Sequence, residues 1–81
     1  MRVAPERIKK EWIDTLTDED LMAVEARLHA QFDVLERREK KLRGASYQLF
    51  RSPPEVMDAW DRWSRVLTAA RARSLNPRRM R

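Results

Sequence analysis

The segment between Thr17 and Gly44 constrains the fold of this 81-residue chain more than any other. Thr17 is a typical helix N-cap with acids directly after it, and Gly44, the only glycine, favours the left-handed turn that ends many helices. Between them an apolar stripe recurs at three-, four- and seven-residue intervals: Leu21, Val24, Leu28, Phe32, Leu35 and Leu42. We therefore expect one amphipathic helix over residues 18–43, about 39 Å long.

Two further helices are expected on either side of this long one. Pro5 suits the first position of a short N-terminal helix, which would carry Ile8, Trp12, Ile13 and Leu16. Ser52 and Glu55 resemble a capping box, so a third helix should run from Pro53 to about Ser74. Its apolar stripe consists of Val56, Trp60, Trp63, Leu67 and Ala70.

These elements predict an all-α fold without a sheet, because no stretch alternates apolar and polar residues at period two. Two long helices joined by a short link favour an antiparallel hairpin, with the short N-terminal helix packed across it. We expect residues 1–75 to form a single helical domain and residues 76–81 a flexible basic tail. A core this small is marginal, and self-association would reinforce it.

The positive charge is concentrated at the C-terminus. The chain has 18 Lys and Arg against 13 Asp and Glu, and five of the 18 lie in residues 71–81, which contain no acid. These are Arg71, Arg73, Arg78, Arg79 and Arg81. An arginine arm of this kind binds phosphates, so we expect it to dock on nucleic acid or a nucleoprotein assembly. Acids at 18–20 are an internal alternative partner for the first two arginines, because an antiparallel hairpin brings them close.

A second basic region surrounds the link between the long helices. It consists of Lys40, Lys41, Arg43 and Arg51, which we also assign to nucleic-acid binding. Pairs such as Glu36 with Lys40 and Glu39 with Arg43 offer another explanation, an ordinary solvated helix face.

Aromatic and apolar residues in and near the link suggest a protein-binding surface. They are Tyr47, Leu49, Phe50, Trp60 and Trp63. Tryptophan is enriched among binding hot spots, although the same residues would also serve as core and as a cap on the end of the hairpin. If this surface binds a protein, the alternative function is that of a protein-directed adaptor or inhibitor.

The leucines at 21, 28, 35 and 42 recur at the coiled-coil interval and support a homodimer, but the second seam position becomes polar at Gln31 and Arg38. Packing within one chain is the other explanation.

No residue pattern indicates catalysis, a metal or a cofactor. Glu25, His29 and Asp33 share one helix face, but Arg37 continues the row, so a ladder of charged pairs is the simpler interpretation. The chain has one His, no Cys and no membrane-spanning apolar run. We therefore expect a cytoplasmic, non-enzymatic helical binding module.

Overall fold

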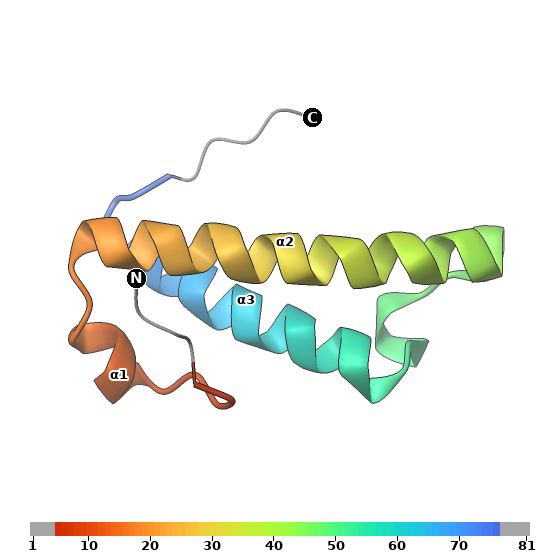
Figure 1. Cartoon of the computed structure of the whole chain (residues 1–81), viewed down its shortest axis with the longest axis horizontal. Coiled ribbons are helices and arrows are strands. Elements are labelled where there is room, and N and C mark those ends of the chain that lie inside the picture. Colours follow the sequence, from red (N-terminus) through yellow and green to blue (C-terminus); the bar gives the residue numbers. More distant parts are fainter. Residues whose placement is uncertain (1–4, 77–81) are drawn as a thin grey trace.

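A computed structural model describes residues 5–76, and all regular secondary structure in this part of the chain is helical (Figure 1). Helix α1 spans Lys10–Asp14, α2 spans Asp18–Arg43 and α3 spans Pro54–Ala72. Two short 3-10 turns, η1 (Gly44–Ser46) and η2 (Leu49–Arg51), lie between α2 and α3. Residues 5–76 contain no strand. The prediction of an all-α fold with a short N-terminal helix and two packed longer helices is confirmed.

Both ends of α2 follow from the residues that flank it. The Thr17 hydroxyl accepts a hydrogen bond from the Asp20 N–H at 3.1 Å, which satisfies one donor of the first turn. At the other end Gly44 has φ 56° and ψ −129°, and its N–H donates to the Lys40 carbonyl. The positive φ was expected for this glycine, but the ψ value leaves the left-handed helical region and turns the chain into the link. We call residues 44–53 the elbow.

Helices α2 and α3 lie side by side and run in opposite directions (Figure 1). Contacts along their length pair Asp18 with Arg73, Glu25 with Trp63, and Arg38 with Glu55.

The main core lies toward the end of the molecule where α2 begins. It consists of Ile8, Ile13, Leu16, Leu21, Val24, Leu28, Val66 and Ala70. The first three of these precede α2, so the N-terminal segment closes that end of the helix pair.

The N-terminal helix begins later than predicted, at Lys10 instead of Pro5. Lys9 is extended, with φ −112° and ψ 150°, and the Pro5 carbonyl accepts a hydrogen bond from Arg62 Nη2 at 3.0 Å. Because the backbone is extended here, Ile8 is buried in the core while Pro5 stays hydrogen-bonded to α3. Tertiary contacts therefore override the local helix signal.

The predicted capping box at the start of α3 does not form. The Ser52 hydroxyl donates to the Gln48 carbonyl at 3.0 Å, and Glu55 forms an ion pair with Arg38 at 3.2 Å. Helix α3 begins instead at Pro54, a proline in the first turn, where the missing N–H costs no hydrogen bond.

The end of α3 is closed by backbone hydrogen bonds. The Arg73 N–H donates to the Ala69 and Ala70 carbonyls, and the Leu75 N–H donates to the Ala70 carbonyl at 2.8 Å. Ser74 takes φ 61° between them. Apart from Asn76, the predicted flexible tail at 76–81 lies outside the described residues.

Candidate functional site

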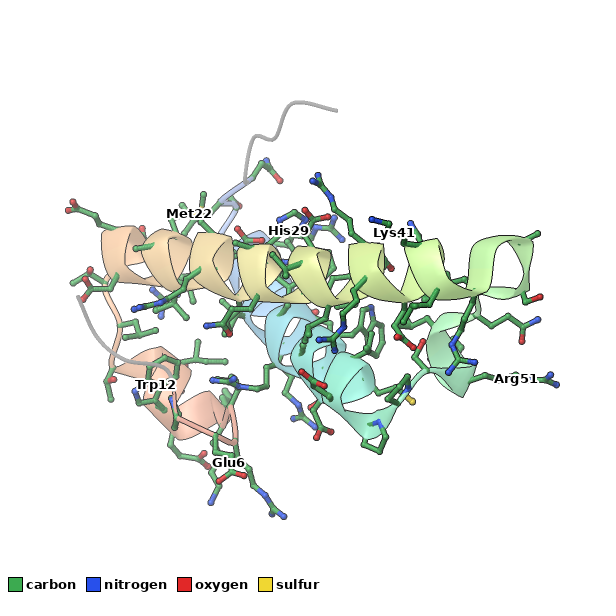
Figure 2. All side chains as sticks on the ribbon, turned by 45° about the vertical axis from the view of Figure 1, so that its right-hand side comes forward. Glu6, Trp12, Met22, His29, Lys41 and Arg51 are labelled. Atoms are coloured by element: carbon green, nitrogen blue, oxygen red, sulfur yellow. The ribbon has the colours of Figure 1, made fainter. Side chains whose placement is uncertain are left out.

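The basic residues assigned to nucleic-acid binding fall into two separate groups. Lys40, Lys41, Arg43 and Arg51 lie at the elbow end of α2, whereas Arg71 and Arg73 lie at the end of α3, next to the start of α2. Figure 2 shows Lys41 and Arg51 toward the elbow and Trp12, on α1, toward the other end. The 26 residues of α2 separate the groups by about 39 Å. The assigned cations within the described residues therefore do not lie together in one basic patch.

Two of the four assigned cations near the elbow are paired with acids of the same chain. Lys40 Nζ lies 3.3 Å from Glu36 Oε1, and Arg43 Nε lies 3.1 Å from Glu39 Oε1. These are the i, i+4 pairs expected of a solvated helix face. Lys41 and Arg51 are exposed and form no ion pair within residues 5–76.

Arg73 is held by its own chain. Its Nη1 donates to the Leu16 carbonyl at 2.8 Å and lies 3.1 Å from Asp18 Oδ1, while its Nη2 donates to the Ile13 carbonyl at 3.0 Å. The guanidinium thus links the end of α3 to the corner between α1 and α2. Arg71, in contrast, is exposed and forms no ion pair with a described acid.

Tyr47 packs back onto α2. Its hydroxyl donates to Glu36 Oε2 at 2.9 Å, and Lys40 Nζ lies 5.6 Å from the centre of its ring. Partial burial, reinforced by the Glu36 carboxylate, raises the pKa of the Tyr47 hydroxyl above its ordinary value of 10.0. The side chain therefore acts as a cap on the elbow end of the hairpin.

Phe50 is the aromatic side chain that the elbow presents to solvent. It is 72% exposed, although its ring contacts the Trp60 ring edge-to-face at a centroid distance of 5.9 Å. Leu49, which precedes it in the sequence, and Trp60, which contacts its ring, are both half-buried. Leu42, the last residue of the predicted α2 stripe, is 73% exposed instead of packed in the core.

Trp63 belongs to the interior between α2 and α3. Its Nε1 donates to Glu25 Oε2 at 2.7 Å, and its ring stacks on Phe32 at 5.5 Å with an interplanar angle of 14°. The His29 ring meets it edge-on at 4.9 Å. These contacts favour the core interpretation of Trp63 over the partner-binding one.

Glu25 was not identified from the sequence as an interior residue, yet it is only 1% exposed. Its position offered a signal, because it lies four residues after Leu21 and seven before Phe32, on the buried face of the helix. Asp33, the other carboxylate of the ladder, pairs with Arg37 at 3.0 Å. Residues 5–76 hold no group of three or more His, Cys, Asp or Glu suited to a metal ion.

A groove between α1 and α3 was also not foreseen. It has a volume of about 470 Å³. Its lining combines apolar and small side chains with four charged ones: Ile8, Ile13, Ser64, Thr68, Ala69 and Ala72, and Lys10, Asp14, Arg65 and Arg73. The short α1 leaves this outer side of α3 uncovered. A neighbouring cleft of about 620 Å³ is polar, with acids and bases mixed along its walls.

Comparison of the chain with protein-family models, with curated proteins and with solved structures finds no match. Within residues 5–76, no helix is both long enough and apolar enough to cross a lipid bilayer.

Proposed function

We propose that this protein is a non-enzymatic, self-associating helical binding module that docks on nucleic acid, or on a nucleoprotein assembly, through its arginine-rich C-terminus. The observation that carries this proposal is the distribution of charge. Residues 5–76 contain 14 Lys and Arg against 13 Asp and Glu, so nearly all of the net charge of +5 lies outside them. Arg78, Arg79 and Arg81 supply three of the remaining positive charges.

The geometry of Arg73 refines how many arginines are available to phosphates. Its contacts to two carbonyls and to Asp18 occupy it within the fold, whereas Arg71 is exposed. Four arginines therefore remain for phosphate contacts: Arg71 in the last turn of α3, and Arg78, Arg79 and Arg81 after it in the sequence. Such an arm reads charge and not base sequence. We expect it to act in the cytoplasm.

A salt series of mobility shifts on duplex DNA and on single-stranded RNA tests the proposal. Four phosphate contacts predict a slope of the log binding constant against log salt of roughly −3 to −4 on the duplex, with little sequence preference. A slope near zero, or no binding at low salt, would reject it.

The control variant carries Lys41→Gln and Arg51→Gln, the exposed and unpaired cations near the elbow. If the tail alone makes the phosphate contacts, this variant keeps the wild-type slope. A slope shallower by about two would show that the elbow contacts phosphate as well.

Exposure of Phe50 favours a second function, binding of a protein through the elbow. A phenylalanine held against Trp60 and still 72% exposed is a suitable anchor for an interface. Phe50→Ala should weaken that protein contact and leave the salt slope on DNA unchanged. Loss of DNA binding in this variant would instead make Phe50 a base-stacking residue.

A further inference from the structure

We infer that the protein forms a symmetric homodimer through the face of α2 that points away from α3, with the two copies of α2 antiparallel and Val34 of each copy packed among alanines of the other. This inference rests on the self-association proposed above and names the surface that forms it. The surface lies within the described residues and is separate from the C-terminal arginines.

Helix α2 has a second apolar face, opposite the one that packs on α3. Each residue of an α-helix is turned by about 100° from the one before it, so residues 23, 26, 30 and 34 point within about 40° of one direction. They are Ala23, Ala26, Ala30 and Val34. Val34 is 66% exposed, Ala26 and Ala30 are exposed as well, and Ala23 is half-buried. The fold of one chain therefore leaves most of this face in water.

The leucines that suggested a dimer seam begin on the other face of α2. Leu21 and Leu28 point about 160–180° away from Ala30, and both are buried in the core of their own chain. They are therefore unavailable to a second copy. A dimer that uses α2 needs the face around Ala30 instead.

Val34 and the alanines are complementary in shape. Ala23, Ala26, Arg27 and Ala30 occupy the i, i+3, i+4 and i+7 positions, which surround a hole on a helix surface. Alanines at three of the four positions let a second helix approach closely. Val34 lies on the same face and is the large apolar side chain that can enter such a hole.

A two-fold axis at Ala30 seats both valines at once. In an antiparallel pair related by this axis, a residue that follows Ala30 lies level with the residue that precedes Ala30 by the same number in the partner. Val34 follows by four, and the middle of the hole precedes by three to four. Each Val34 therefore lies over the hole of the other copy, and the repeated contact closes the dimer.

The charges at the two ends of this face select the same arrangement. Glu19 and Lys41 lie eleven residues before and after Ala30 and point within about 20° of its direction. Both are exposed, and neither forms an ion pair within residues 5–76. The two-fold axis at Ala30 brings Glu19 of each copy level with Lys41 of the other. A parallel pair would instead place like charges together, which disfavours it.

Sedimentation equilibrium over a concentration series, without nucleic acid, tests the dimer. Ala30→Arg brings two like charges together at the two-fold axis and should raise the dimer dissociation constant at least about a hundredfold. Gln31→Arg is the matched control, because it adds the same charge at the next exposed residue, which is turned by about 100° from Ala30. A wild-type chain that stays monomeric, or equal effects of the two variants, would overturn the inference.

The phosphate contacts are measured separately from the dimer, by the salt series described above. A monomeric wild-type chain that still shows a slope of roughly −3 to −4 would reject the dimer alone. A dimer with a slope near zero would reject the phosphate contacts and leave this inference standing.

Exchange of the two end charges tests the register. Glu19→Lys alone and Lys41→Glu alone each place like charges together at both ends of the dimer, so each should raise the dissociation constant about fivefold or more at low salt. The double variant restores opposite charges at both ends and should dimerise as the wild type does. Single variants that match the wild type, or a double variant as weak as the single ones, would show that Glu19 and Lys41 are not partners.

Discussion

Arg73 shows how one side chain can connect three parts of a small fold. Its guanidinium donates to the carbonyl of Ile13, in the last turn of α1, and to the carbonyl of Leu16, in the segment between α1 and α2. It also pairs with Asp18 at the start of α2. Carbonyls at a helix end need donors, and arginine provides several in a fixed plane. Without these contacts, Arg73 would be assigned to phosphate binding together with the other C-terminal arginines.

We predict that Arg73→Ala lowers the free energy of unfolding by roughly 1.5–3 kcal/mol, because hydrogen bonds to a charged donor are lost and partly buried carbonyls lose a partner. Urea unfolding followed by circular dichroism measures this. Arg71→Ala, two residues away and exposed, should cost less than about 0.5 kcal/mol. Equal effects of the two substitutions would contradict the internal role of Arg73.

Tyr47 gives a pH-dependent prediction, and as the only tyrosine it can be followed alone by absorbance near 295 nm. Its pKa is raised in the folded chain, so the stability it contributes is fully present below the unfolded pKa of about 10 and is lost as pH rises through the folded pKa. Glu36→Gln should lower the pKa of Tyr47 toward its ordinary value. A titration unchanged by this substitution would exclude the Glu36 hydrogen bond as a cause.

The helices differ in whether local sequence signals or tertiary contacts determine where they form. Helix α2 carries its own start and stop signals, and its 26 residues form as expected. Helix α1 has five residues and a first residue without a side-chain cap, so its position depends on burial of Ile8 and Ile13 and on the hydrogen bond to Pro5. We expect α1 to be the least stable helix, because short helices depend on tertiary packing.

Gly44, at the end of α2, allows a test of whether its backbone conformation requires glycine. At φ 56° and ψ −129°, Gly44 occupies the mirror image of a conformation common for L-residues, and a Cβ there meets no atom within 4 Å. Gly44→Ala should therefore destabilise the fold by about 1–3 kcal/mol through backbone strain alone.

A synthetic chain with D-alanine at position 44 is the matched control. D-alanine favours this conformation and restricts the unfolded chain, so it should keep or slightly raise the stability of the glycine form. Equal destabilisation by both enantiomers would mean that space, and not backbone conformation, requires glycine.

On the scale of the whole molecule, local signals predicted the helical class and the extent of α2, but not the details that depend on long-range packing. The apolar stripe predicted for α3 includes Leu67. In the structure its neighbour Val66 is the fully buried residue, because α2 packs against that side of the helix. Burial of Glu25 could be suspected from its position but depends on a donor 38 residues away, the Trp63 indole. The groove could not be foreseen, because it exists only where α1 stops short of covering α3.

The composition of residues 5–76 makes them nearly neutral, so the account rests on the claim that the residues after them carry the charge that binds nucleic acid. The most direct measurement compares nucleic-acid affinity at low salt for the full chain and for a chain that ends at Asn76. We predict that the shorter chain keeps its helicity and urea midpoint but loses at least about tenfold in affinity, together with most of the salt slope. Equal affinity and an equal slope for the two chains would contradict the account.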